Sequence, residues 1–222
     1  MKQVARILSK ENLTHDVLRI IAEKPSNLIY QPGQAVDVSI NQHDWEAEIR
    51  PFTFTSLPED EFVEFTIKTY PSHKGVTNHL LDLHIGEELI IGEVFGDIHY
   101  KGEGIFIAGG AGVTPFIAIL KHLEKENKIG NNQLIFANKT KADIILEDKF
   151  QALLGDNFIN VLSDDKIDGY ENGYITEEII KKHITGSNQY FYLCGPEPMM
   201  NAVEKQLNAL GVTESYIVKE AF

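Results

Sequence analysis

The sequence contains a single cysteine, Cys194, among its 222 residues. One thiol cannot form an internal disulfide, a four-cysteine iron–sulfur cluster or a cysteine-rich zinc site. The eight histidines show no metal-ligand spacing, so we expect no bound metal. Residues 1–6 lack the apolar stretch of a secretion signal. A reduced, cytoplasmic setting is therefore the expectation for this chain.

Long apolar runs and clustered basic charge are also scarce. The longest uncharged run, Gly104–Leu120, is interrupted by glycines and a proline, which favours a buried strand, turn and helix over a membrane span. The net charge is -13, and acidic residues occur throughout the chain without a basic tract. Nucleic acid and membrane surfaces are therefore not expected as partners.

Residues 2–99 have the pattern of a β domain. Short segments rich in β-branched and apolar residues alternate with turn residues, which predicts a small barrel or sandwich. The expected strands are Gln3–Leu8, Asp16–Ala22, Ala35–Ile40, Glu48–Thr55, Phe62–Tyr70 and Glu88–Ile91. One helix is expected near Thr77–Leu83.

The pattern changes after the turn at residues 101–104. Buried strands then alternate with helices, which predicts a parallel sheet with helices on both faces. The expected strands are Ile105–Ala108, Gln133–Ala137, Phe158–Leu162, Tyr190–Leu193 and Ser215–Val218. We therefore predict two domains, residues 1–101 and residues 102–222.

The segment Arg50-Pro-Phe-Thr-Phe-Thr-Ser56 places a cation, aromatic rings and hydroxyls at the end of an expected strand. A flavin needs a flat apolar surface for its ring, a cation for its phosphate and donors toward N5 and O4. Phe52, Arg50 and Thr53 could supply these in turn. Taken alone, the segment fits an ordinary half-buried strand better.

A second segment of the same domain shifts that balance. Lys74-Gly75-Val76-Thr77-Asn78 opens the expected helix, and a glycine followed by a hydroxyl cap leaves backbone N–H groups free for a phosphate. Helix starts are common, so this segment is also a modest signal alone. Combined with Arg50 in one domain, it favours a phosphate site.

Two glycine-containing turns lie in the second domain. Gly109-Gly-Ala-Gly-Val-Thr-Pro115 follows a buried strand and precedes a helix, where a pyrophosphate can approach the backbone at the carboxyl edge of the sheet. Its spacing differs from the usual G-x-G-x-x-G fingerprint. Cys194-Gly-Pro-Glu-Pro-Met-Met200 ends a later strand at the same edge. Cys194 has no basic residue or histidine in its motif, so no thiolate nucleophile is expected.

Taken together and in this order, the motifs resemble those of the ferredoxin–NADP reductase-like superfamily of flavoproteins, and the resemblance spans nearly the whole chain. It implies an antiparallel β-barrel that binds flavin, followed by an α/β domain that binds NAD(P). It also implies hydride transfer from nicotinamide to flavin and electron delivery to an acceptor. FAD is the expected flavin, with FMN as the alternative.

The resemblance assigns roles to residues at matching positions. Thr53, which would hydrogen-bond flavin N5, and Cys194, beside the nicotinamide, are the catalytic candidates. The implied flavin-binding residues are Arg50, Pro51, Phe52, Thr53, Ser56, Lys68, Gly75, Val76, Thr77 and the terminal aromatic Phe222. The implied dinucleotide-binding residues are Gly110, Gly112, Val113, Thr114, Pro115, Ser163, Gly195, Pro196 and Met199.

Two positions depart from the usual motifs. Phe52 replaces a tyrosine and lacks its hydroxyl, and the segment is also similar to reductases that use flavin as a substrate. After the third strand, Ser163-Asp164-Asp165-Lys166 stands where NADP-preferring members commonly carry Ser-Arg. Two carboxylates would repel a 2′-phosphate, so NADH is favoured over NADPH.

Three functions remain open at this stage. The first is a reductase that holds FAD and serves a separate acceptor such as ferredoxin, flavodoxin or a small molecule. The second is an NAD(P)H:flavin oxidoreductase that uses free flavin as its substrate. The third is a non-catalytic nucleotide-binding subunit of an electron-transfer system. Because ferredoxins and flavodoxins are generally acidic, the acidic chain would need a local basic cluster, such as Lys68 and Lys74, to dock them.

Overall fold

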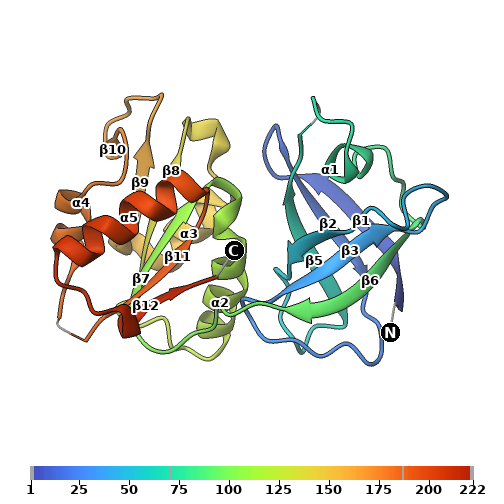
Figure 1. Cartoon of the computed structure of the whole chain (residues 1–222), viewed down its shortest axis with the longest axis horizontal. Helices are drawn as coiled ribbons and strands as arrows, with labels where there is room; N and C mark the ends of the chain where they lie inside the picture. The colour runs from blue at the N-terminus through green and yellow to red at the C-terminus, as the bar shows by residue number, and fades with distance from the viewer. Residues whose placement is uncertain (1–2, 71, 187, 221–222) are drawn as a thin grey trace. The chain divides into compact units, whose positions relative to one another are not determined.

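The computed structural model describes residues 3–70, 72–186 and 188–220 (Figure 1). It divides into two compact units. Unit 1 spans the residues up to Gly96 together with Thr114–His122, and unit 2 spans Asp97–Val113 and the residues from Leu123 onward. In the part of the chain that the structure describes, no helix is both long enough and apolar enough to cross a bilayer.

Unit 1 is built on one antiparallel sheet. Its strands are β1 (Gln3–Asn12), β2 (Val17–Glu23), β3 (Ala35–Ile40), β4 (Arg50–Thr53), β5 (Phe62–Lys68) and β6 (Glu88–Phe95), in the order β4-β3-β6-β1-β2-β5. Phe54, the residue after β4, forms a bridge with Phe65 of β5 at the other edge of the sheet. The two edge strands therefore meet, and the sheet closes into the predicted antiparallel barrel.

Aromatic packing fills the place where the barrel closes. Phe54 is fully buried, stacks on Tyr30 with ring centroids 3.9 Å apart, and lies 5.4 Å from the Phe65 ring. Alternate residues of the strands point inward, as the apolar pattern of the sequence predicts.

Helix α1 (Val76–His79) is shorter than the helix predicted over Thr77–Leu83. After His79 the backbone continues in tighter turns, in which the N–H groups of Leu81 and Asp82 donate to carbonyls three residues back at 3.0 Å. The ammonium of Lys10 donates hydrogen bonds to the carbonyls of Leu81, at 2.8 Å, and of Leu83. These carbonyls lie beyond the end of the helix and have no partner within it, so Lys10 satisfies them.

Unit 2 is built on a parallel sheet. Its strands are β7 (Gly104–Gly109), β8 (Gln133–Asn138), β9 (Phe158–Leu162), β10 (Glu171–Asn172), β11 (Tyr190–Cys194) and β12 (Ile217–Lys219), in the order β10-β9-β8-β7-β11-β12. The five predicted strands are confirmed within a few residues. The sixth, β10, has only two residues and so leaves no periodic signal in the sequence.

Helices cover both faces of the unit 2 sheet (Figure 1). The helices of the chain after α1 are α2 (Thr114–Lys125), α3 (Glu147–Leu154), α4 (Glu177–His183) and α5 (Glu197–Ala209). Helices α4 and α5 share an apolar cluster with one face, in which Ile179 and Val203 pack with Ile107. Phe150 of α3 meets Phe136, 6.4 Å away and edge-on, on the other face. The predicted α/β architecture is therefore confirmed.

Closure of the barrel can be tested at Phe54. We expect Phe54→Ala to lower the free energy of unfolding by about 3–5 kcal/mol, because it removes a fully buried ring from between two others. Urea denaturation followed by circular dichroism measures this. Tyr174→Ala, at a position that is 80% exposed, is the control and should change stability little. An equal loss of stability in both variants would contradict the packing role.

Candidate functional site

The two glycine-containing turns of unit 2 meet at one edge of the sheet. Parallel strands all end at the same edge, and β7 ends at Gly109 while the neighbouring β11 ends at Cys194. The register pairs Cys194 with Ala108, so the turns that follow the two strands start side by side. The structure thus brings together motifs that lie far apart in the sequence.

Backbone packs directly on backbone between these turns. A β carbon added at Gly112 would lie 2.5 Å from the carbonyl carbon of Cys194 and 2.6 Å from the Cα of Gly195. One added at Gly109 would lie 2.6 Å from the sulfur of Met199. At Gly112 the neighbouring atoms are backbone and cannot move aside, so this position requires glycine, whereas at Gly109 the flexible Met199 side chain would have to shift. The contact holds the two turns at a fixed separation.

The first turn leads straight into a helix. Gly110 has φ +51°, a left-handed conformation that favours glycine, and a short 3-10 turn over Gly110–Val113 precedes α2. The side chains of Val113, Thr114 and Pro115 are buried. The backbone of the turn, with its N–H groups, is therefore what this edge offers to a ligand.

Two polar side chains at this edge were missed by the sequence reasoning. Within the described residues, both polar atoms of the Asn138 side chain and Oε1 of Glu220 are buried without a hydrogen-bond partner. Asn138 ends β8, and Glu220 follows β12 at a position that continues the pairing of Leu193 with Lys219. Asn138 is the first polar residue after an apolar run, a signal that the sequence does contain, whereas Lys219 separates Glu220 from the apolar residues of its strand.

Unpaired buried polar groups are costly, so these two suit an added ligand. An amide and a carboxyl group can pair with the ribose hydroxyls and the carboxamide of a nicotinamide dinucleotide. Burial, with the nearby charge of Asp97, raises the pKa of Glu220. The donors and acceptors at the edge therefore fit a dinucleotide.

Cys194 is a protonated thiol at this edge. Burial, reinforced by the charge of Glu220, raises its pKa to about 12. At neutral pH the sulfur is therefore neutral and a poor nucleophile. The sequence likewise predicted no thiolate nucleophile at this position. It can still contact a bound ring as a small polarizable group.

The corner after β9 carries fixed acidic groups. The Ser163 hydroxyl donates to Asp164 Oδ1 at 2.6 Å, and the Ser163 N–H donates to the carbonyl of Asn138 at 3.1 Å. Asp165 accepts a hydrogen bond from the N–H of Lys141 at 2.8 Å. Two carboxylates are thus held beside the end of β8, and Asp164 is exposed.

The predicted flavin segment of unit 1 forms β4 and its continuation. Arg50 is exposed and donates to the carbonyl of Ile49 at 2.6 Å. Phe52 is half-buried and packs against the barrel core, with its ring 6.3 Å from that of Phe65. Pro51 is exposed and Thr53 is half-buried. The segment presents a cation, a ring and a hydroxyl from one short strand, a combination that fits a flavin phosphate and ring.

The loop that leads to Arg50 lies against helix α1. Trp45 stacks on His79 with centroids 4.1 Å apart and planes 6° apart, and His79 Nε2 is 2.8 Å from Gln42 Oε1. The two predicted phosphate-binding segments are therefore joined through this loop. Sequence reasoning did not single out Trp45 or His79, because stacking between a loop and a helix leaves no local pattern.

The start of α1 differs from the expectation in one respect. Gly75 is the N-cap, without a side-chain hydrogen bond, and Thr77 lies inside the helix rather than at its cap. Val76 is buried in the barrel core. Gly75 and Thr77 are half-buried, so the backbone of this turn, not a hydroxyl cap, would meet a phosphate.

Two further predicted binding residues have partners inside unit 1. Ser56 is fully buried, and its hydroxyl lies 2.9 Å from Tyr30 Oη and accepts from the N–H of Glu64 at 2.9 Å. Lys68 forms an ion pair with Asp16 at 2.8 Å.

Phe222, the remaining residue predicted to bind flavin, lies outside the described residues. Gly195 and Met199 belong to the turn contact described above, and Pro196 is exposed beside them.

Comparison with known families matches both halves of the chain. Residues 2–94 match the FAD-binding domain family, and residues 106–205 match the oxidoreductase NAD-binding domain family. The chain belongs to the ferredoxin–NADP reductase-like superfamily. The flavin-binding and nicotinamide-binding halves that the motifs predicted thus each match a family with that description. The FAD-binding family matches the barrel, and the NAD-binding family matches the α/β unit.

Individual relatives and a solved structure agree with this membership. The chain is 29% identical to the reductase component of propane 2-monooxygenase from Mycolicibacterium goodii, over 97% of the chain and 66% of that relative. It is 27% identical to NADH-cytochrome b5 reductase 1 from Pyricularia oryzae, over 94% of the chain and 74% of that relative. The FAD/NAD-binding domain of nitric oxide dioxygenase from Vibrio cholerae shares the fold, with a TM-score of 0.86 at 24% identity, covering 99% of the chain and 98% of that structure. The chain thus spans 66% of the first relative's length.

The contact between the two turns can be tested at Gly112. We expect Gly112→Ala to weaken NADH binding at least about tenfold, because even a 1 Å displacement of a binding backbone is costly. Isothermal titration calorimetry measures the affinity. Gly186→Ala is the matched control, since a β carbon there meets nothing within 4 Å. Unchanged NADH affinity in a folded Gly112→Ala protein would contradict a role for this turn in dinucleotide binding.

Proposed function

We propose that the chain takes a hydride from NADH onto FAD and passes the electrons to a separate, cytoplasmic redox protein. The observation that carries this proposal is the paired glycine turns of unit 2, with the unpartnered Asn138 amide and Glu220 carboxyl at the same edge. The FAD-binding family match over residues 2–94 supplies the other half of the argument. FAD, when bound, accepts a hydride and releases electrons one at a time.

In unit 1, the segment of β4 would hold the flavin. The exposed guanidinium of Arg50 would bind the phosphate, and the ring of Phe52 would cover one face of the isoalloxazine. Thr53 would donate a hydrogen bond at N5 and so orient the ring. The backbone at Gly75 would complete the phosphate site.

In unit 2, the carboxyl edge would hold the dinucleotide. Backbone N–H groups of the Gly110–Val113 turn would bind the pyrophosphate. The Asn138 amide and the Glu220 carboxyl would gain the partners that they lack among the described residues. The neutral Cys194 and the thioether of Met199 would form an apolar border that excludes water from the nicotinamide.

The corner after β9 favours NADH as the donor. A 2′-phosphate bound there would face the carboxylates of Asp164 and Asp165, and Lys166 could offset only part of this repulsion. The relative named NADH-cytochrome b5 reductase supports the same preference. The specificity for the donor would therefore come from charge at one corner.

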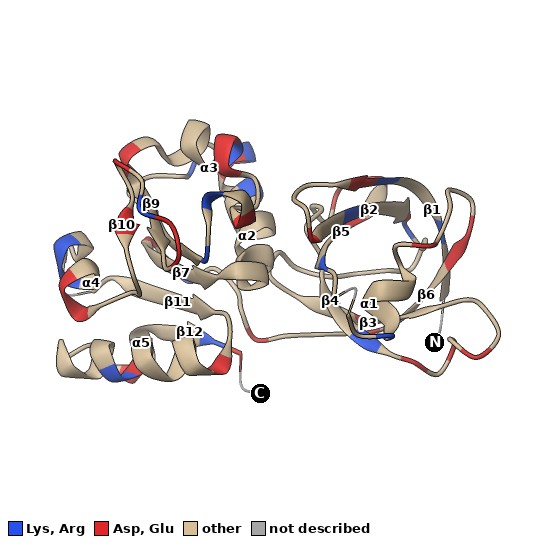
Figure 2. Ribbon diagram, turned by 90° about the horizontal axis from the view of Figure 1, so that it is seen from above, with Lys and Arg blue, Asp and Glu red and all other residues tan. Residues whose placement is uncertain are grey.

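A separate protein is the proposed acceptor. Relatives carry the names reductase component of propane 2-monooxygenase, electron transfer component of toluate 1,2-dioxygenase and cytochrome b5 reductase. These names describe proteins that pass electrons to a partner. Figure 2 shows that Asp and Glu occur on elements of both units of this chain. We therefore expect docking to weaken at low ionic strength if the carrier is acidic, as ferredoxins and flavodoxins generally are.

Anaerobic titration of the purified protein tests the function directly. We expect a yellow protein whose visible flavin absorption bleaches with one equivalent of NADH. Bound FAD is then identified after denaturation by chromatography. A colourless protein that reduces added flavin would instead establish flavin as a substrate. A flavin-loaded protein that neither NADH nor NADPH bleaches would establish a non-catalytic subunit.

Donor preference can be reversed at Asp164. We expect Asp164→Arg to raise the ratio of kcat/KM for NADPH to that for NADH about tenfold or more, since one close charge pair is worth roughly 1–4 kcal/mol. Steady-state kinetics with both donors measure the ratio. Asp168→Arg makes the same charge change at another exposed position of the loop and should leave the ratio nearly unchanged. An equal shift in both variants would mean that general charge, not this corner, sets the preference.

A further inference from the structure

A carboxylate is buried in the wall of the barrel. The side chain of Glu64 in β5 is 4% exposed. Burial alone would raise its pKa, yet the charges and hydrogen bonds of Lys121 and Arg19 hold the pKa below its ordinary value. Glu64 is therefore ionised, and both of its oxygens have charged partners.

Arg19 and Lys121 bind different oxygens of the Glu64 carboxylate. Arg19 binds Oε2 twice, through Nε at 2.8 Å and Nη2 at 2.5 Å, and its other Nη pairs with the exposed Glu11. Since surface ion pairs are weak, Arg19 remains available to neutralise Glu64. Lys121 neutralises Glu64 as well, and its charge is the largest of the influences that lower the pKa of this carboxyl.

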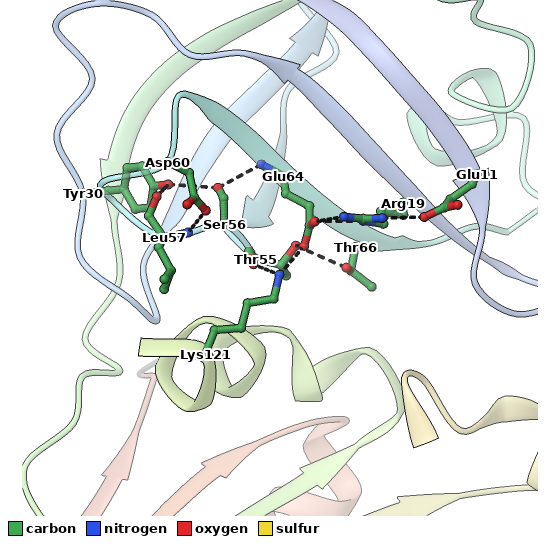
Figure 3. Close-up of polar contacts among 10 residues, drawn as sticks. All are labelled: Glu11, Arg19, Tyr30, Thr55, Ser56, Leu57, Asp60, Glu64, Thr66 and Lys121. Carbon is green, nitrogen blue, oxygen red and sulfur yellow. Dashed lines mark hydrogen bonds and ion pairs between the residues drawn. The ribbon is translucent and has the colours of Figure 1, made fainter. Parts of the chain in front are cut away.

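Lys121 makes a contact that neutralisation does not require. Its ammonium donates to Glu64 Oε1 at 2.7 Å and to the backbone carbonyl of Thr55 at 2.6 Å (Figure 3). Lys121 lies in the part of helix α2 that belongs to unit 1. Five consecutive apolar residues of that helix, residues 116–120, precede it and are buried. The lysine thus places a charged group directly after a buried apolar stretch of the helix.

The segment that Lys121 contacts continues the proposed flavin strand. Thr55 and Ser56 follow Thr53 by two and three residues, and both are fully buried. The Thr55 hydroxyl donates to Glu64 Oε1 at 2.9 Å, and the Thr55 N–H donates to the Glu64 carbonyl at 2.8 Å. Ser56 accepts from the N–H of Glu64 at 2.9 Å. Thr55 and Ser56 are therefore hydrogen-bonded to Glu64, and the carbonyl of Thr55 is also bound by Lys121 (Figure 3).

We propose that Lys121 is a positioning residue, which fixes the Thr53–Ser56 segment through the Thr55 carbonyl and so holds Thr53 in place for the flavin. This inference rests on the proposed role of Thr53 at flavin N5. Lys121 touches neither cofactor in this proposal. A charged hydrogen bond to a buried carbonyl restrains the backbone more tightly than apolar packing alone, and hydride transfer depends on sub-ångström orientation.

Hydrogen exchange tests the restraint without reference to catalysis. We expect Lys121→Met to speed amide exchange in peptides covering residues 50–60 about tenfold, measured by mass spectrometry. Exchange in the strand β2, on the far side of Glu64, should change much less. Lys125→Met, an exposed lysine of the same helix, is the control. Unchanged exchange over residues 50–60 would overturn the proposal.

Stopped-flow reduction tests the consequence for the flavin. We expect Lys121→Met to lower the rate of flavin reduction by NADH about tenfold while the NADH dissociation constant stays within about twofold. Lys121→Arg keeps a cation and donors and should recover most of the rate. A normal reduction rate in Lys121→Met, despite faster exchange, would overturn the positioning role.

The two measurements separate this inference from the proposed function. If wild-type protein binds flavin but NADH does not reduce it, the proposed function fails, while hydrogen exchange and the visible spectrum of the bound flavin still decide the role of Lys121. A spectrum shifted in Lys121→Met and restored in Lys121→Arg would support the restraint. If Lys121→Met does not fold, Lys121→Gln supplies the same comparison with the charge removed and a donor retained.

Discussion

The contact of Gly112 with the backbone of Cys194 and Gly195 is the constraint on which unit 2 depends. A β carbon at Gly112 would overlap backbone atoms of Cys194 and Gly195, so the two turns lie in direct backbone contact at this point. The rest of the carboxyl edge is arranged around this contact. Asn138 ends β8 and Glu220 follows β12, with β7 and β11 between the two strands. Both polar atoms of the Asn138 side chain and Oε1 of Glu220 are enclosed without partners among the described residues. A site with a rigid backbone and unpaired polar side chains suits a polar ligand, which would supply the missing hydrogen-bond partners.

Unit 1 solves a different physical problem. A barrel this small has little room for charge, yet it encloses the Glu64 carboxylate. Arg19 and Lys121 keep the carboxylate ionised, and the hydroxyls and backbone around it are drawn into one connected set of hydrogen bonds. Such a network is costly if broken at one point, because the remaining charge stays buried. The network contacts Thr55 and Ser56, which follow Thr53, and in this way it would support the proposed flavin site.

Much of the site could be predicted from the sequence because its signals are local. Glycine-containing turns after apolar strands, and Arg50 beside Phe52, are patterns within a few residues. Asn138, at the polar end of β8, carries the same kind of signal and could have been found by extending the rule to every strand. Glu220 could not, because Lys219 is the first polar residue after the apolar part of β12. Lys121 could not, since a lysine after a buried helical run normally only ends the apolar face. The contact of Lys10 with the carbonyls that follow α1 was equally hidden, because Lys10 comes from β1, far away in the sequence.

The sequence by itself determined the class of the protein and its two architectures, because strand and helix periodicities and turn residues act over short distances. The order of motifs along the chain, matched by the two families, then established the superfamily. The tertiary structure decided which groups are buried, paired or left unpaired. Burial keeps Cys194 a neutral thiol, and the packing of distant segments brings Asn138 and Glu220 to the same edge of the sheet and Lys121 to Glu64. These outcomes depend on contacts between distant segments. The free energy of a charge or a hydrogen bond is set by the atoms that surround it in space, and not by its neighbours in sequence.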